Sequence, residues 1–239
     1  MLRKIRILLQ VVTITLVTLL LLGIGFRVNL WAGWVAKIQF LPAVLALSFG
    51  ILVLLIVATL IFGRLYCSVV CPLGIMQDFF SWLGGKFKKN RFGYAKDKLW
   101  LRLACLAVFI IALIVGFAPV TTLIEPYSAY SRIVNSLFKP LYDMLNNWLA
   151  SIDAANDRYN FTEVQVWMRS VTTFVVAILT LIILGVLAIW KGRLYCNTIC
   201  PVGTALGFIS RFSLLRVRFD KDKCKSCGMC EKNCKAQAI

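Results

Sequence analysis

The sequence contains no histidine among its 239 residues. Because imidazole is the ligand in bis-histidine haem and in histidine-based zinc catalysis, both kinds of centre are excluded within this chain. Acidic residues are also scarce, with 10 Asp and Glu against 27 Lys and Arg. Methionine occurs only five times, which argues against copper trafficking. Metal chemistry in this chain must therefore depend on its nine cysteines.

Apolar residues dominate what is present. They make up 60% of the chain, and the mean hydropathy is +0.83, whereas a soluble domain is about 45–50% apolar. The composition therefore indicates a membrane protein. In such a protein a net charge of +17 is typical of loops that face anionic lipid. Membrane lipid, rather than nucleic acid, is the expected partner.

Four apolar runs without Asp, Glu, Lys or Arg are long enough to cross about 30 Å of hydrocarbon. They comprise residues 7–26, 43–62, 103–120 and 171–190. The sequence thus predicts an all-α membrane protein with four transmembrane helices. The first run resembles a signal peptide, but its length and the lack of an A-x-A cleavage site favour an anchor helix.

The distribution of basic residues predicts the orientation. If the N-terminus is cytoplasmic, residues 1–6, 63–102 and 191–239 hold 21 of the 27 Lys and Arg, and the external segments hold six. We therefore expect a multi-pass protein of the inner (cytoplasmic) membrane with both termini in the cytoplasm. The cytosol is reducing, so cysteines on this side are expected to be metal ligands or redox groups rather than structural disulfides.

Two further segments carry an apolar stripe at helical spacing. These are residues 75–87 and 131–152, and both are interpreted as helices lying at the membrane surface. For the second segment, a wall of a quinone site or a docking surface is the alternative. Cys105 stands alone in an apolar run, where free cysteine packs as a small hydrophobic residue.

The C-terminal segment has the cysteine spacing of a ferredoxin. Cys224, Cys227, Cys230 and Cys234 follow the pattern C-x2-C-x2-C-x3-C, which is typical of [4Fe–4S] binding. Structural zinc normally uses two separated pairs, so zinc is disfavoured. We accordingly divide the chain into a membrane domain, residues 1–218, and the start of a ferredoxin-type module, residues 219–239.

In two-cluster ferredoxins the fourth cysteine of such a run ligates the other cluster. The sequence ends at Ile239, five residues after Cys234. Three explanations are open: the chain is a fragment, Cys234 completes a single cluster, or a partner supplies the missing ligand. We favour the fragment, and so expect two clusters in the full-length chain.

An internal repeat carries the other paired cysteines. Residues 63–74 read GRLYCSVVCPLG and residues 192–203 read GRLYCNTICPVG, identical at eight of twelve positions. Each repeat follows an apolar run, and repeats in membrane proteins commonly place a site at their interface. We therefore predict that Cys67, Cys71, Cys196 and Cys200 form one metal or iron–sulfur site. The alternatives are reversible disulfides, or helix-ending turns whose cysteines pack as apolar residues.

Other residues of the repeats suit such a site. Cysteines four positions apart share one face of a helix. Pro72 and Pro201 lack an amide hydrogen, which suits the first position of a helix. Arg64 and Arg193 precede the first cysteine of each pair by three residues, where a guanidinium can stabilise thiolate charge.

Together the motifs GRLYCSVVCPLG, GRLYCNTICPVG and CKSCGMCEKNC resemble those of the NapH/NosR/MauN-type membrane-bound 4Fe–4S polyferredoxins, nearest to the small NapH-like members. The resemblance covers essentially the whole chain. It implies a membrane electron-transfer protein, often working between the quinone pool and a redox partner, and a second four-cysteine run after Cys234.

Three functions remain in competition. The first is an electron-transfer subunit that relays electrons between the quinone pool or membrane and a partner oxidoreductase or ferredoxin subunit, and is not itself a complete enzyme. The second is a cysteine-based protein that handles or reduces copper. The third is a membrane redox sensor. The ferredoxin run favours a relay or a sensor, because a metal carrier needs no cluster.

Overall fold

We describe the protein from a computed structural model. The residues that the structure describes are 2–23, 33–45, 49–87, 99–155, 162–166, 170–215 and 227–228. Helices and turns account for almost all of these, and the described part of the chain contains no strand. The all-α prediction is confirmed for these residues.

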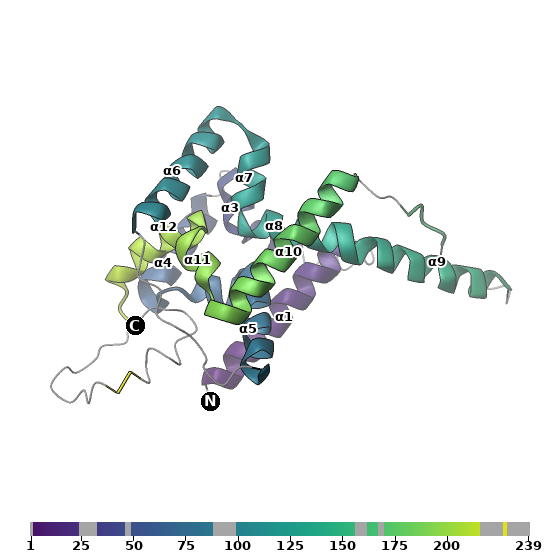
Figure 1. The fold of residues 1–239 in the computed structure, drawn as a ribbon, viewed down its shortest axis with the longest axis horizontal. Helices are drawn as coiled ribbons and strands as arrows, with labels where there is room; N and C mark the ends of the chain where they lie inside the picture. Colours follow the sequence, from purple (N-terminus) through teal and green to yellow (C-terminus); the bar gives the residue numbers. More distant parts are fainter. Residues whose placement is uncertain are drawn as a thin grey trace.

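The helices run in the following order: α1 (Leu2–Leu22), α3 (Phe40–Leu45), α4 (Phe49–Phe62), the π-helical turn η1 (Tyr66–Val70), α5 (Pro72–Phe87), α6 (Leu99–Val115), α7 (Ala118–Ile124), α8 (Pro126–Ile133), the π-helical turn η2 (Val134–Phe138), α9 (Lys139–Ala155), α10 (Val171–Lys191), α11 (Leu194–Thr198), α12 (Pro201–Ile209) and the 3₁₀ turn η3 (Ser210–Phe212). Residues 33–37 are also helical. Figure 1 shows their arrangement, with α9 projecting from the other helices.

Two helices are long and apolar enough to cross a membrane by length and composition: Lys4–Leu22 and Val171–Lys191. The predicted spans at 43–62 and 103–120 correspond instead to the shorter apolar helices α4 and α6, of 14 and 17 residues. About 20 residues are needed to cross the hydrocarbon without local thinning. The prediction of four transmembrane helices is therefore not confirmed and remains a prediction.

Helix α5 differs from the surface helix expected at 75–87. Its first half is buried, with Leu73 inaccessible and Ile75 and Met76 less than 10% exposed. The helix packs against α10, α1 and α8. A Cβ on Gly84 would lie only 2.9 Å from the Cγ2 atom of Ile189 in α10. The missing side chain thus permits the close contact between the two helices, and α5 is part of the core.

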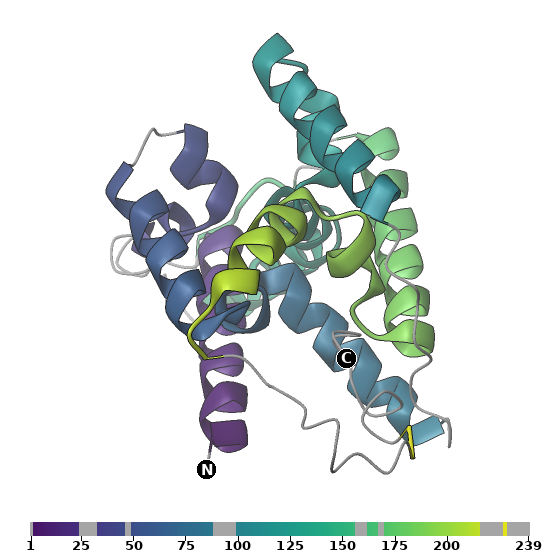
Figure 2. The same ribbon diagram turned by 90° about the vertical axis from the view of Figure 1, so that its left-hand side faces the viewer.

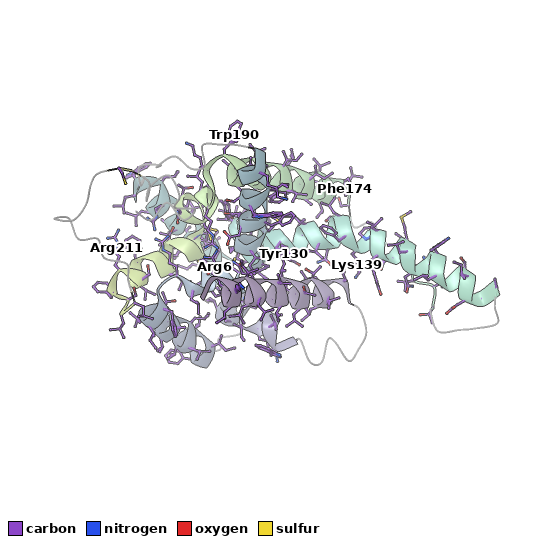
Figure 3. All side chains as sticks on the ribbon, turned by 90° about the horizontal axis from the view of Figure 1, so that it is seen from below. Arg6, Tyr130, Lys139, Phe174, Trp190 and Arg211 are labelled. Carbon is purple, nitrogen blue, oxygen red and sulfur yellow. The ribbon has the colours of Figure 1, made fainter. Side chains whose placement is uncertain are left out.

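Helix α9 continues the line of α8 through η2. Figure 3 shows Tyr130 and Lys139 along this rod, with Phe174 and Trp190 marking the two ends of α10. Val134 at the start of the predicted apolar stripe is buried, but the stripe beyond it is open. Its exposed members are Phe138, Leu141, Leu145, Trp148, Leu149 and Ile152. This pattern agrees with the interpretation of 131–152 as an interfacial helix.

The helices before the two repeats bury equivalent positions. The repeats are offset by 129 residues (Gly63 to Gly192). At that offset Leu55 and Thr59 of α4 correspond to Leu184 and Ala188 of α10, and all four side chains are buried. Both helices therefore turn the same face to the interior. Figure 2 shows α12, which follows the second repeat, between α4 and α6.

Candidate functional site

The two repeats fold in nearly the same way. Gly63 ends α4 with φ 70°, and Gly192 ends α10 with φ 69°, a left-handed conformation that favours glycine. Cys71 has φ −74° and ψ 114°, and Cys200 has φ −66° and ψ 117°. The duplication in sequence is thus a duplication in backbone structure.

The second cysteine of each pair is extended rather than helical. Its amide donates to the carbonyl oxygen of the repeat tyrosine, over 2.9 Å from Cys71 to Tyr66 and 3.0 Å from Cys200 to Tyr195. The expectation of two cysteines on one helical face is therefore wrong in detail, because the helix ends before the second cysteine. The expectation for the prolines is confirmed: α5 and α12 begin directly after these cysteines, at Pro72 and Pro201.

Glycines at equivalent positions let the chain fold back on itself. A Cβ on Gly74 would clash with the carbonyl oxygen of Cys67, and one on Gly203 with that of Cys196. The amide of Gly203 also donates to Sγ of Cys200, over 3.3 Å. Each glycine thereby brings the start of the next helix against the first cysteine of its repeat.

All four repeat cysteines are buried, free thiols. Burial raises the pKa of each, for Cys196 to about 12. Negative charge on Cys67 raises the pKa of Cys196 further, and charge on Cys196 raises the pKa of Cys71 and of Cys200. The thiols of the two repeats therefore lie near enough for their charges to interact.

Within the described residues, no three Cys, His, Asp or Glu side chains lie close enough together to hold one metal ion. The sharing of one metal or cluster by the four cysteines remains a prediction.

The arginine of each repeat forms hydrogen bonds with the other half of the protein. Arg64 of the first repeat donates to Oδ1 of Asn197 in the second, over 2.7 Å. Arg193 of the second repeat donates twice to the carboxylate of Asp78, just after the first repeat, over 2.9 and 2.5 Å. Each arginine thus ties its own repeat to the other half of the molecule.

The arginines also act on the cysteines, as expected. At Cys67, burial raises the pKa most strongly, while the positive charges of Arg193 and Arg64 lower it. Burial alone would lower the pKa of Arg193, but the attraction of Asp78 outweighs it, so this pKa is raised. The site thus holds permanent positive charge beside thiols that are otherwise isolated from water.

Helix α1 is joined to this network near its start. The side-chain amide of Gln10 donates to Asp78 over 2.9 Å and to the carbonyl oxygen of Ser68 over 2.7 Å. Arg6, labelled in Figure 3, lies 3.7 Å from the same carboxylate. Asp78 therefore holds together the start of α1, the start of α5 and the second repeat.

The repeat tyrosines fasten the site to the segments between the long helices. The hydroxyl of Tyr66 donates to Oε1 of Gln39 over 3.1 Å and accepts from the amide of Phe40 over 3.0 Å. The hydroxyl of Tyr195 donates to the carbonyl oxygen of Ile124 over 2.7 Å. The segments around Gln39 and Ile124 are thereby held against the repeats.

Two buried polar side chains near the cysteines were not singled out from the sequence. Gln77 is 1% exposed, and its Oε1 accepts a hydrogen bond from Sγ of Cys196 over 3.5 Å. Glu125 is completely buried between α7 and α8, where it accepts from the amide of Ser128, and burial raises its pKa. Polar residues in apolar surroundings are the sequence signal that could have indicated both.

The ferredoxin cysteines fall mostly outside the described residues. This applies to Cys224, Cys230 and Cys234, while Cys227 is described as an exposed free thiol. Their assignment as cluster ligands therefore remains a prediction. Cys105 in α6 is a free thiol of intermediate exposure, more open than the buried position predicted for it.

Comparison with known proteins identifies the domains. A family model described as a 4Fe–4S binding domain matches residues 43–90 and 172–221, the two parts that contain the repeats. A second model of the same description matches residues 216–239, which contain the ferredoxin cysteines. No solved structure matches the chain.

Curated relatives agree with these matches. The putative electron transport protein YccM of Escherichia coli is 25% identical over 81% of this chain and 47% of its own length. The methylamine utilization ferredoxin-type protein MauN of Paracoccus denitrificans is 26% identical over 85% of this chain and 57% of its own. The ferredoxin-type protein NapH of E. coli is 26% identical over 80% and 53%.

The chain spans about half the length of these relatives. The resemblance inferred from the motifs is confirmed by the breadth of the matches along this chain. The chain is thus homologous to the ferredoxin-type proteins NapH and MauN, carries 4Fe–4S binding domains, and has the [4Fe–4S] cluster as its cofactor.

Proposed function

We propose that the protein is a membrane-bound iron–sulfur subunit that relays electrons between the membrane quinone pool and a partner oxidoreductase or ferredoxin subunit. One [4Fe–4S] cluster is held between the repeats by Cys67, Cys71, Cys196 and Cys200. Cys224, Cys227 and Cys230 are ligands of a second cluster. Cys234 is a ligand of a third cluster, which is completed in the full-length chain. The relatives NapH, MauN and YccM are named as ferredoxin-type or electron transport proteins, which supports this function.

The residues between the repeats suit such a cluster. Thiolates are the usual ligands of iron–sulfur clusters, and hydrogen bonds to sulfur help to set their potential. Four thiols are buried together, Gly203 already donates to Cys200, and the amide of Gly74 faces Cys71 in the same way. Arg64 and Arg193 supply positive charge to offset that of a cluster with four thiolates. This meeting of two buried cysteine pairs is the observation that carries the proposal.

A single ion and a four-iron cluster make different demands on four thiolate ligands. Sulfurs around one zinc ion must each lie about 2.3 Å from the metal, whereas a four-iron cluster places its own iron and sulfide atoms between its ligands. The match of both repeat-containing parts of the chain to a 4Fe–4S binding domain model favours the cluster.

A bound cluster would supply one-electron transfer at this site. The chain contributes the surroundings: Tyr66 and Tyr195 hold the segments around Gln39 and Ile124 against the repeats, and burial of the cysteines excludes water. Arg193, fixed by Asp78, keeps its charge beside Cys67 and Cys196. The positive charge of Arg193 favours the reduced cluster, whereas exclusion of water disfavours added negative charge, so the two effects act on the potential in opposite directions.

The exposed apolar surface supports a place in the membrane. In α10, Leu179, Ile182 and Ile183 are each more than half exposed, and in α6 Ile111 and Ile114 are as well. Water-soluble proteins rarely leave such extended apolar surfaces open. We propose four crossings of the inner membrane with both termini cytoplasmic, α4 and α6 being the shorter crossings. The open face of α9 then lies at the opposite surface, in contact with lipid.

The decisive experiment compares single substitutions in each repeat. Cys67→Ala and Cys196→Ala, purified anaerobically in detergent, should each lose about four iron and four acid-labile sulfide per chain, because either change removes a ligand of the same cluster. The same electron paramagnetic resonance signal should disappear from both dithionite-reduced variants, while the ferredoxin signal stays. Cys105→Ala serves as the matched control and should keep all its iron.

Other outcomes would contradict the proposal. If both variants keep the full iron and sulfide content, the repeat cysteines are not cluster ligands. If the two variants lose different signals, the repeats hold separate centres. Copper bound in place of iron, and lost in both variants, would favour the metal-handling alternative.

A further inference from the structure

We propose that Gln77 is a positioning residue for the cluster between the repeats: in the cluster-bound protein its side-chain amide donates a hydrogen bond to the thiolate of Cys196 and raises the reduction potential. The inference rests on the proposed function, because it requires Cys196 to be a cluster ligand. It concerns a side chain outside both cysteine motifs.

The hydrogen bonding of Gln77 is incomplete without a cluster. The side chain is 1% exposed, and its Oε1 accepts from the thiol of Cys196 over 3.5 Å. Its Nε2 atom is buried and has no hydrogen-bond partner among the residues that the structure describes. A buried amide nitrogen without an acceptor is unfavourable, and such atoms are rare in native proteins. The unused donor lies on the side chain that already contacts the cysteine.

Cluster binding changes Cys196 from a hydrogen-bond donor to an acceptor. Cysteine binds iron as the thiolate, which has no hydrogen to donate and is a strong acceptor. The Oε1 atom of Gln77 would then face a negatively charged sulfur. A half-turn of the terminal amide exchanges oxygen and nitrogen at almost no change in shape. After this rotation Nε2 donates to the thiolate, and the unfavourable contact becomes a hydrogen bond.

A partner for the rotated oxygen is available on the same helix. Ser81 lies one turn after Gln77 on the same face of α5, and side chains on a helix lean towards its N-terminus. Its hydroxyl is buried and, within the described part of the chain, also has no hydrogen-bond partner. The hydroxyl can donate to the oxygen of Gln77 once the amide has turned. One rotation of the Gln77 amide thus gives a hydrogen-bond partner both to Nε2 of Gln77 and to the hydroxyl of Ser81.

The position equivalent to Gln77 in the second half of the protein carries no hydrogen-bond donor in its side chain. At the offset of 129 residues Gln77 corresponds to Leu206, which is 1% exposed and has no polar atom in its side chain. The cluster is therefore surrounded unequally, with a donor beside Cys196 and an apolar side chain at the equivalent place. Leucine is consequently a natural test residue for position 77, because the same fold already accommodates it at position 206.

The prediction concerns the one-electron reduction of the cluster by dithionite, in which no bond is formed or broken. A hydrogen bond to sulfur stabilises the extra negative charge of the reduced cluster and so raises its potential. In Gln77→Leu the ratio of reduced to oxidised cluster at a fixed potential should fall about tenfold, which is 59 mV for a one-electron couple. Iron and sulfide content should match the wild type.

The experiment is a redox titration of the detergent-purified chain followed by electron paramagnetic resonance. Gln77→Leu is compared with Leu206→Met, which changes the equivalent buried side chain without adding or removing a donor and should leave the potential unchanged. The potential of the ferredoxin cluster serves as an internal reference. Gln77→Met, unbranched and without a donor, is measured beside Gln77→Leu and should show the same shift.

The possible results separate the two proposals. If the wild type holds no cluster between the repeats, the proposed function fails. A second result is that the cluster is present and that Gln77→Leu and Gln77→Met have the same reduction potential as Leu206→Met. In that case the role given to Gln77 is wrong. Loss of the cluster from both Gln77 variants, with Leu206→Met intact, would also overturn it, since Gln77 would then act in assembly.

Discussion

Arg193 forms a bidentate ion pair with Asp78, which lies 115 residues earlier in the sequence. The pair joins the second repeat to the helix that follows the first, and both side chains are only 11% exposed. Arg64 occupies the equivalent place in the first repeat and lies beside Gly207, the counterpart of Asp78; a Cβ there would be 2.7 Å from its Nη2 atom. The pseudo-symmetry therefore extends beyond the motifs, but the position that holds an aspartate beside Arg193 holds a glycine beside Arg64.

Substitution of Asp78 should strongly destabilise the protein. Asp78→Asn leaves the buried guanidinium of Arg193 without its counter-charge, and breaking a buried pair in this way costs about 3–5 kcal/mol. Thermal unfolding of the detergent-solubilised protein, followed by tryptophan fluorescence, measures the effect. Arg6→Gln is the control, because its exposed contact with the same carboxylate is worth at most about 1 kcal/mol. Equal losses in the two variants would contradict this account of Asp78.

Glycine at the end of each repeat should be indispensable. Gly203→Ala places a methyl group against the carbonyl oxygen of Cys196 and should displace the cysteine, reducing bound iron and lowering the melting temperature. Gly74→Ala should act in the same way on Cys67. Gly85→Ala in α5 is the matched control: its Cβ would meet nothing within 4 Å, and alanine favours the helix by up to about 1 kcal/mol. Wild-type iron content in Gly203→Ala would refute the close approach.

The carboxyl group of Glu125 should make stability depend on pH. Burial raises its pKa in the folded protein, so its contribution to stability is present at low pH and is lost as the pH rises through that raised pKa. Glu125→Gln keeps an acceptor for the amide of Ser128 but carries no charge. Its melting temperature should exceed that of the wild type at pH 8, and the difference should vanish towards pH 4. A difference that is constant over this range would show that the carboxyl group is not the cause.

Reporter fusions should place both repeats on the cytoplasmic side of the membrane. A fusion after Phe92 should give the cytoplasmic signal, because Phe92 lies in one of the three segments (1–6, 63–102 and 191–239) that together carry 21 of the 27 basic residues. A fusion after Asn160, in the segment between α9 and α10, should give the external signal. An external signal after Phe92 would reverse the topology and place the ferredoxin cysteines on the wrong side for a cytoplasmic partner.

The sequence by itself determined the local features of the protein. Apolar runs, glycine and proline positions, and cysteine spacing act over a few residues, so they indicated the long helices, the starts of α5 and α12 at Pro72 and Pro201, and the family. The repeat also predicted that the two halves would resemble each other, and Gly63 and Gly192 do so within 1° in φ.

Only the tertiary structure decided which side chains meet. The apolar spacing of 75–87 fitted a surface helix equally well, and burial of α5 depends on the close contact of Gly84 with Ile189 more than 100 residues away. No sequence motif includes Gln10, Gln77 or Asp78. Their roles at the site depend on hydrogen bonds to residues in other helices. A buried polar group must find its partner wherever packing brings one, and no pattern over a few residues records that choice.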